Sequence, residues 1–473
     1  MGQRMKSPSD RNRLPWEVVL FFTLYVFSPS YFALELSDKL PLLTVSRVLL
    51  ILMGVMLLIR RRNEIFPLRN LKLARWNFCL TEDKFLRTGL LVYFVLLLIC
   101  DAALLWADAG EAVKAMFSVV AENYALVWML TLILDTREKL KKALQILVLS
   151  SAVVAVIVTI GCVFNCNPFY WLNTVQREML MSAYYRLGLL RAEAGFGHPV
   201  YYGAFCAVIT PINMYFIEHG ESRWKKLLFS GCQVMNLVGL VLSNSRGSLC
   251  IFALLVVLVA VIRIWEKRFA EFLRTYLPIG LAALAILAVV AQLSPAGLAF
   301  LKGIVNSMIN AIAPNTVSMD IIVDENTLIS YGENVGGAHS RKAQLTGILW
   351  TMQRNPLVGL GSNAHMRGLV SYQYKPGIWS VADTFDVALV AIICQYGILG
   401  FIGYTALFGS VFKTTAIKQY RQDPLMQFLG LAFVSFMLCL ITISSLDKVS
   451  WVLYAVIVCL VNIIIKESAH TAK

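Results

Sequence analysis

The sequence predicts an all-α polytopic membrane protein of about 12 transmembrane helices. Of its 473 residues, 58% are hydrophobic and only 15% are charged, which is more apolar side chain than a soluble core of this length could bury. The apolar residues form continuous runs of roughly 20, the length of helix that crosses a hydrocarbon layer about 30 Å thick. These runs are continuous rather than short and alternating, so they predict helices and not a membrane β-barrel.

Twelve runs of the chain fit a spanning helix, and we expect them to form a single transmembrane domain over residues 1–473. Their approximate limits are 16–36, 40–60, 88–106, 112–134, 142–165, 199–217, 225–243, 247–265, 273–293, 384–410, 424–444 and 449–466. The first run is full length and no small-residue cleavage pattern flanks it, so we expect it to remain as a helix and not to be a cleaved signal peptide.

The basic residues sort by loop. With the N-terminus in the cytoplasm, most of the 42 Lys and Arg residues fall in the tails and in the short loops of one side, which is the positive-inside pattern. Both termini are therefore predicted to be cytoplasmic. The net charge of +14 does not form a basic stripe with interleaved aromatic residues, so nucleic acid is not an expected partner.

Two longer segments, 166–198 and 294–383, fall on the outer side by the same count. The second is about 90 residues long, too long for a simple connector, and we expect it to be a long periplasmic loop. Within it, residues 340–355 place Leu345, Ile348, Leu349 and Met352 at helical spacing. This spacing predicts an amphipathic helix that ends before Pro356 and lies on the outer membrane face or caps a cavity.

Candidate site residues gather at the outer helix ends. Arg191 stands in RAEAGFGHPVYYGAF, Arg246 in the tight turn LSNSRGSL, and Arg341 opens the amphipathic helix. Guanidinium groups stay charged and bind phosphate oxygens in pairs, so three converging arginines would suit a lipid-linked diphosphate. The serines near Arg246 add donors beside a helix N-terminus, which also favours anions.

Each candidate also has a structural interpretation. Arg246 could anchor a helix end by reaching lipid phosphates, Arg341 could lie on a solvated face, and Arg191 has Arg177 and Arg186 as nearby competitors. Asp383, in VADTFD, could be the N-cap of the run at 384–410, with Asp386 completing a capping box.

Taken together, four motifs resemble the superfamily of O-antigen ligases and of O-antigen and exopolysaccharide polymerases. They are RAEAGFGHP, SNSRGS before an apolar helix, SRKAQLTGILWTMQRNPLVGLGSN, and VADTFDVALVAIICQYGILG, spread over about 190–405. The resemblance implies a metal-independent, inverting membrane glycosyltransferase of the type C kind in the bacterial inner membrane. Its donor would be an undecaprenyl-diphosphate-linked glycan, and its acceptor a glycan or lipid A-core at the periplasmic face.

The resemblance assigns roles to the candidates. Arg246 and Arg341 would hold the diphosphate leaving group, assisted by Arg191. Where the ligase branch commonly has histidine followed by asparagine, this chain has Asp383 and Thr384. A carboxylate can also accept the proton of an acceptor hydroxyl, so this difference favours a repeat-unit polymerase over a ligase. A transporter is the alternative of another class, but it would place charged residues at the bilayer midplane on discontinuous helices.

Other polar residues were weighed against these. His339, two residues from Arg341, is a second candidate base. His198, His339 and His365 do not show the spacing of metal ligands. Glu35 and Asp38 resemble the paired acids of metal-dependent type C glycosyltransferases, but nothing else in the sequence supports a metal site there, so no metal or other cofactor is expected. Cys162 and Cys166 could form a disulfide. Arg47 and Asp101 lie inside apolar runs, where they could form an ion pair or line a cavity.

Overall fold

A computed structural model gives the fold of the chain. It describes residues 13–36, 41–65, 79–175, 185–186, 189–294, 302–303, 305–306, 309, 321–324, 327–329, 338–375, 377–382, 384–444 and 447–471. Statements about what is present or absent below refer to these residues.

Helices occupy all twelve predicted runs. They are α2 (Trp16–Phe27), α3 (Val45–Ile65), α5 (Lys84–Ala103), α6 (Ala109–Phe117) continued by η2 (Ser118–Tyr124) and α7 (Ala125–Ile133), α8 (Arg137–Val163), α9 (Pro199–Glu218), α10 (Arg223–Leu242), α11 (Arg246–Trp265), α12 (Phe269–Leu293), α16 (Ala388–Ala416), α18 (Pro424–Cys439) and α19 (Asp447–Thr471). Within the described residues, nine helices are long and apolar enough to cross a membrane, and α2 and α18 are shorter apolar helices. The all-α membrane fold is confirmed.

The first helix is shorter than predicted. Helix α2 ends at Phe27, and the strand β1 (Ala33–Leu34) follows and pairs with β2 (Leu43–Thr44). Pro29 explains the difference, because the residue before a proline is disfavoured in helical conformation. The sequence therefore carried the signal that stops the helix at this point.

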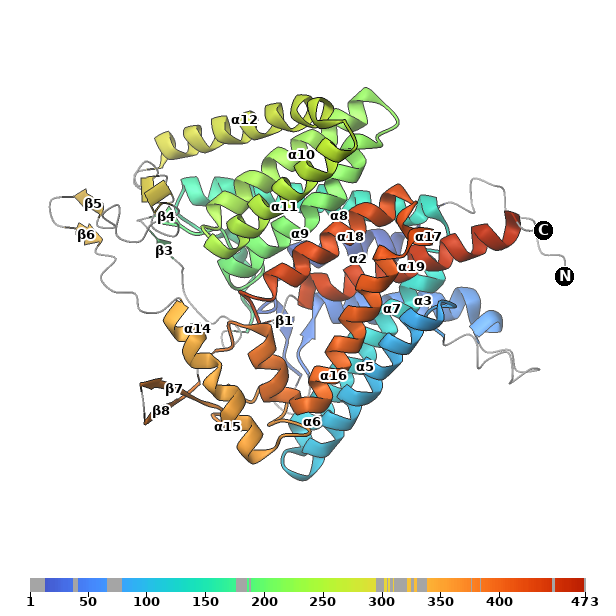
Figure 1. The fold of residues 1–473 in the computed structure, drawn as a ribbon, viewed down its shortest axis with the longest axis vertical. Coiled ribbons are helices and arrows are strands. Elements are labelled where there is room, and N and C mark those ends of the chain that lie inside the picture. The colour runs from blue at the N-terminus through green and yellow to red at the C-terminus, as the bar shows by residue number, and fades with distance from the viewer. Residues whose placement is uncertain are drawn as a thin grey trace.

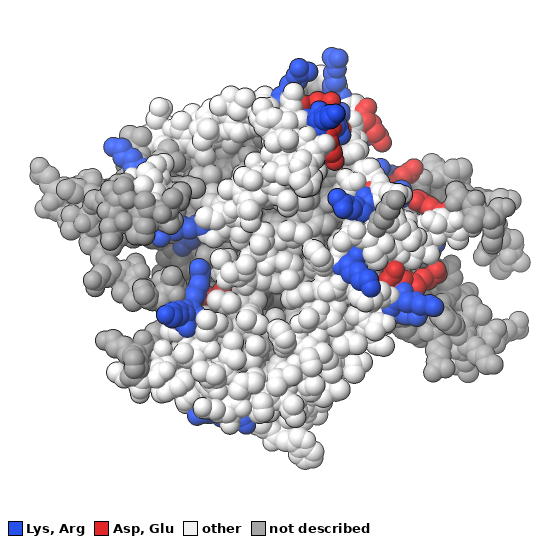
Figure 2. All heavy atoms as spheres, in the orientation of Figure 1, with Lys and Arg blue, Asp and Glu red and all other residues white. Residues whose placement is uncertain are grey.

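Charged side chains are separated along the bundle. In Figure 1 the long helices run side by side, with α17 (Lys418–Arg421) and α19 to the right and α14 (Ala338–Gln344) and α15 (Thr346–Arg354) to the left. Figure 2 shows acidic and basic side chains gathered at the right and upper right, with an almost uncharged band between them and the left side. Large apolar side chains are also exposed on the long helices, such as Leu281 and Leu284 of α12, which are 57% and 63% exposed. Such a band is typical of a surface that faces lipid.

Arg47, within the membrane helices, forms an ion pair with a residue other than Asp101. Arg47 of α3 pairs with Glu122, which also accepts a hydrogen bond from Ser118 at 3.0 Å. Glu122 lies in η2, a π-helical segment of seven residues between α6 and α7. Asp101 is fully buried in α5, and neither of its carboxylate oxygens has a hydrogen-bond partner within the described residues. Of the two roles that the sequence left open for Arg47 and Asp101, the mutual ion pair is therefore wrong.

Helix α16 is broken at Gly397, and the segment at 356–361 fills the break. The amide groups of Leu360 and Gly361 donate to the carbonyls of Cys394 and Gln395 at 2.8 and 2.9 Å. On the other side of the break, the amide of Ile398 donates to Pro356 O at 2.9 Å. These bonds replace the helical hydrogen bonds that the break removes, which is how an irregular backbone is tolerated at membrane depth.

Glycines make this approach possible. Gly397 has φ of 60° and ψ of −155°, a conformation that side chains rarely permit, and a Cβ there would lie 2.5 Å from Leu357 O. A Cβ on Gly359 would lie 2.5 Å from the carbonyl carbon of Gln395. The N-P-L-x-G-x-G and Y-G-I-L-G motifs therefore meet each other, and their glycines serve backbone packing.

The predicted amphipathic helix of the long loop is two helices, α14 and α15, that meet at Leu345. Gly347 and Thr351 are buried. A Cβ on Gly347 would lie 2.8 Å from the ring of Tyr372, in the hairpin of β7 (Ser371–Lys375) and β8 (Ile378–Val381). Leu345 and Leu349, which were expected on the apolar face, are 46% and 61% exposed. Ile348 packs against the buried cluster that contains Tyr372, and Met352 is half-buried. The predicted apolar face is therefore divided, with two of its four residues turned toward the rest of the protein to different degrees and two turned outward.

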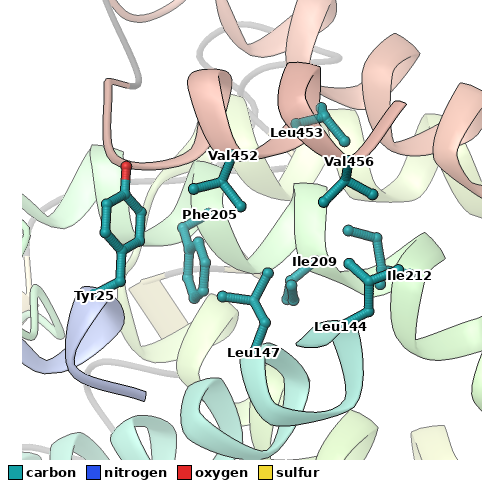
Figure 3. A pocket seen from close by; sticks show the side chains of 9 residues that line it. All are labelled: Tyr25, Leu144, Leu147, Phe205, Ile209, Ile212, Val452, Leu453 and Val456. Carbon is teal, nitrogen blue, oxygen red and sulfur yellow. The ribbon is translucent and has the colours of Figure 1, made fainter. Parts of the chain in front are cut away.

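A small pocket lies inside the bundle between α2, α8, α9 and α19 (Figure 3). Its lining residues are Tyr25, Leu144, Leu147, Phe205, Ile209, Ile212, Val452, Leu453 and Val456. The lining is apolar apart from the Tyr25 hydroxyl, so this pocket has no groups for a diphosphate. The polar candidates lie instead at the helix ends.

Candidate active site

The turn between α10 and α11 is built from buried serines and one left-handed residue. Ser243, Asn244 and Ser245 are each 3% exposed or less, and Asn244 has φ of 47°. Ser245 is the N-cap of α11, and its hydroxyl lies 2.9 Å from that of Ser248. Arg246 is therefore the first residue of α11, and its side chain is exposed. The turn presents a cation at a helix N-terminus, where anions are favoured.

Arg191 is attached to this same turn. Its Nε donates to Ser243 O at 3.0 Å and its Nη2 donates to Asn244 O at 3.3 Å. The next amide, that of Ala192, donates to Leu242 O at 3.0 Å. Arg191 thus satisfies carbonyls at the C-terminal end of α10, and it holds the segment before α9 beside Arg246. Of its competitors, Arg177 lies outside the described residues, and nothing is described of the Arg186 side chain.

Arg341 lies in α14, partly exposed, and its buried Nε has no hydrogen-bond partner within the described chain. One turn later, Gln344 connects α14 to the segment that precedes α16. Its Nε2 donates to Asp386 Oδ2 at 3.0 Å, and the Asp386 amide donates to Gln344 Oε1 at 2.9 Å. Within the described residues no hydrogen bond joins Arg341 to Arg191 or Arg246, although α14 lies on the same side of the bundle as β3 (Tyr185–Arg186) and β4 (Leu189–Leu190) (Figure 1).

Asp383, the predicted proton acceptor, lies outside the described residues. Its neighbour Thr384 is placed by Tyr372, whose hydroxyl donates to Thr384 O at 2.6 Å. Helix α16 begins at Ala388 with Val387 as its N-cap and no side-chain cap. The alternative interpretation of Asp383 as the N-cap of this helix was therefore wrong, because the helix starts later than predicted. His339 belongs to α14, and its side chain is not described.

His198, at the end of the RAEAGFGHP motif, lies at the start of a helix and is largely enclosed by neighbouring residues. It is the N-cap of α9, where its Nδ1 accepts from the Val200 amide at 3.1 Å. Its ring lies 5.8 Å from that of Tyr201, whose hydroxyl is 3.1 Å from that of Ser444. Burial lowers the pKa of His198 to about 4; the Arg191 cation also lowers it, and Asp386 acts in the opposite direction. His198 therefore lies within the electrostatic reach of both Arg191 and Asp386.

Glu193 is a second residue that sequence reasoning missed. It is 3% exposed, and its Oε1 accepts from Asn167 Nδ2 at 3.0 Å. Burial raises its pKa to about 7, against the opposing effects of Tyr170, Asn167 and Arg191. The motif RAEAG contained the residue, but only the fold shows that the loop after α8 encloses it.

Two cysteines near the C-terminal end of α8 were candidates for a disulfide. Cys162 and Cys166 are both free thiols, and the Cys162 Sγ instead donates to Leu190 O at 3.4 Å. The suggested disulfide was wrong.

Residues 232–405 match the O-antigen ligase (Wzy_C) family. The match includes Arg246, Arg341, the break in α16 and the segment that fills it. Arg191, Glu193 and His198 precede it. No curated protein matches the chain.

This match confirms the resemblance to the O-antigen ligase and polymerase superfamily. It supports a membrane glycosyltransferase of the O-antigen ligase or polymerase type. A transporter was expected to have discontinuous helices, and α16 is a broken helix. The peptide groups of residues 356–361 fill the break, however. The break therefore does not by itself indicate a transport path.

Proposed function

We propose that the chain transfers a glycan from undecaprenyl diphosphate to a sugar hydroxyl at the periplasmic face of the bacterial inner membrane, as a repeat-unit polymerase. The observation that carries the proposal is the attachment of Arg191 to the turn that presents Arg246. Two guanidinium groups at one outer helix N-terminus suit a diphosphate at the bilayer surface. Both termini would be cytoplasmic, and residues 294–383 would form the periplasmic loop that carries Arg341.

The proposed reaction is a displacement at the anomeric carbon. The acceptor hydroxyl oxygen forms a new bond to that carbon while the bond to the diphosphate oxygen breaks, with inversion of configuration. The bond electrons leave with the diphosphate, where the arginines stabilise the developing charge. Asp383, or His339 as the second candidate, takes the proton of the hydroxyl. This scheme requires no metal ion.

The polymerase assignment depends on the acceptor. Asp383 and Thr384 stand where ligases commonly have histidine and asparagine, and this favours a sugar acceptor over lipid A-core. The O-antigen ligase description of the matching family makes transfer to lipid A-core the second candidate.

A chromosomal deletion tests the proposal. Loss of long surface glycan with single repeat units retained on lipid A-core supports the polymerase. Polymer that accumulates on the carrier lipid without reaching lipid A-core supports the ligase. Unchanged surface glycan contradicts both. Complementation with the intact gene is the control.

A further inference from the structure

We infer that a pocket at the other end of α10 from the Arg246 turn binds the phosphate group of an anionic lipid. The pocket lies between α8, α9 and α10, beside the loop of residues 219–222 that joins the last two helices. Helix α10 has 20 residues, so about 30 Å separate the pocket from the Arg246 turn. The distribution of basic residues predicts that this end of the bundle is cytoplasmic. The inference therefore concerns a second site and does not depend on the proposed transfer reaction.

The walls of the pocket combine aromatic rings with two lysines. Lys141 comes from the second turn of α8 and Lys225 from the first turn of α10, and both line the pocket. Lys141 Nζ lies 5.7 Å from the centre of the Tyr215 ring, and the His219 ring stacks on the same ring at 4.8 Å between centres. Two cations from different helices thus line one space, and an aromatic ring of a third helix lies between those helices.

The size of the pocket suits a small ligand or a headgroup. Its empty space is about 310 Å³, including the part that is open to solvent, which is close to the lower limit for pockets that hold small molecules. The first turn of α10 borders this space, and the N-terminus of a helix favours an anion. The pocket can therefore take a phosphate group with a few neighbouring atoms, but not a whole lipid.

The charges in the pocket favour an anion that replaces a carboxylate. Among the lining residues Glu221 is acidic, and it forms an ion pair with Lys225. A hydrogen bond from Lys225 lowers the pKa of Glu221, and the charges of Lys225 and Lys141 lower it further. Both lysines therefore act on the place that this carboxylate occupies. The Glu221 side chain is 83% exposed, and an exposed ion pair contributes little to stability, so a phosphate can take its place.

Exposed apolar side chains beside the pocket favour a lipid over a free solute. Trp224, Leu227 and Leu228 flank Lys225 in the first two turns of α10, and they are 80%, 63% and 51% exposed. An exposed tryptophan and leucines next to lysines are typical of a helix end at the level of the lipid headgroups. A phosphate held in the pocket would leave its acyl chains beside these side chains. The ligand class that we assign is an anionic phospholipid.

Binding of phosphatidylglycerol to the purified full chain in detergent, measured by native mass spectrometry, tests the inference. Lys141→Gln and Lys225→Gln should each weaken binding of the first lipid about fivefold, and the double variant about twentyfold. Lys141→Arg keeps the charge and should bind as the wild type does. Arg268→Gln removes another exposed cation from the same end of the bundle, one that also pairs with a nearby glutamate. It is the matched control and should leave binding unchanged.

A variant of opposite effect separates binding from damage to the fold. Glu221→Gln removes the carboxylate that now pairs with Lys225, so it should tighten binding of phosphatidylglycerol about two- to fivefold. A less stable fold would not produce tighter binding. Melting temperatures of all variants should equal that of the wild type, because the substituted side chains lie at the surface of the pocket.

Three results would overturn the inference. The first is equal affinity of the wild type and the double variant Lys141→Gln and Lys225→Gln for phosphatidylglycerol. The second is an equally large loss of phosphatidylcholine binding in the double variant, because that lipid carries no net charge and the lysines would then only support the fold. The third is displacement of phosphatidylglycerol by an equal concentration of inorganic phosphate, which would assign the pocket to a free phosphate in place of a lipid.

Discussion

Gln344 and Asp386 bind each other at two points, through the side-chain amide nitrogen at 3.0 Å and through the Asp386 backbone amide at 2.9 Å. They lie 42 positions apart in the chain. The pair fixes α14, which carries Arg341, to the segment that leads into α16.

Removing this contact should misplace Arg341. We expect Gln344→Ala to lower kcat/KM for transfer about tenfold, because it removes a hydrogen bond to a carboxylate and a partner of the Asp386 amide. Arg341→Ala should then add little further loss, since both changes disable the same group. Gln353→Ala, at an exposed position of α15, is the matched control. Full additivity of the Gln344 and Arg341 losses would show that the contact does not position Arg341.

The break in α16 offers a matched pair of glycines. Gly397→Ala should destabilise the protein by at least about 1–2 kcal/mol, because φ is positive and the new Cβ would lie 2.5 Å from Leu357 O. Gly409→Ala, in the same helix with open space around it, should be neutral or stabilising by up to about 1 kcal/mol. Thermal unfolding in detergent measures both. Equal melting temperatures for the two variants would contradict the tight approach of 356–361 to α16.

Glu193 should make stability depend on pH. Its pKa rises from an ordinary value of 4.5 to about 7 in the folded protein, so folding favours the protonated form. The stabilisation is complete below about pH 4.5 and is lost as pH rises toward 7. The melting temperature of Glu193→Gln minus that of the wild type should therefore increase as pH rises from about 4.5 to 7, and this difference should stay constant above pH 7. A constant difference between the two proteins from pH 4.5 to 7.5 would show that Glu193 does not titrate there.

The sequence predicted the helices well because each depends on a local run of apolar residues. All twelve runs are helical, and even the early end of α2 had a local signal in Pro29. The break at Gly397 had no such signal. It depends on a segment some forty residues earlier that supplies the missing hydrogen bonds, and periodicity carries no information about that contact.

The sequence predicted the main arginines of the candidate site, but not the contacts that bring them together. The sequence singled out Arg191 and Arg246, and the structure places them at one turn. Their link runs through backbone carbonyls of Ser243 and Asn244, which no residue pattern reveals. The sequence left open whether Arg47 pairs with Asp101 or lines a cavity, because its actual pairing with Glu122 depends on how α3 packs against α7. For His198, a polar residue before Pro199 and an apolar run was a usable N-cap signal.

Asp383 should affect the chemical step more than donor binding. If it accepts the proton of the acceptor hydroxyl, Asp383→Asn lowers kcat about 10²- to 10⁴-fold and leaves the KM for the lipid-linked donor nearly unchanged. Single-turnover kinetics with a synthetic donor separate the two parameters. Parallel loss of kcat and donor affinity would point to a structural role, and a larger loss of kcat in His339→Asn would move the base to His339.

Arg246→Ala tests the central claim most directly. In proteoliposomes holding a polyprenyl-diphosphate-linked glycan and a sugar acceptor, the wild-type protein should release polyprenyl diphosphate and lengthen the acceptor. Arg246→Ala should reduce both products about 10²- to 10³-fold, with membrane insertion and melting temperature unchanged. Arg268→Ala, an exposed arginine just before α12, should transfer normally. Wild-type rates of both products in Arg246→Ala would contradict the diphosphate site at the α10 and α11 turn.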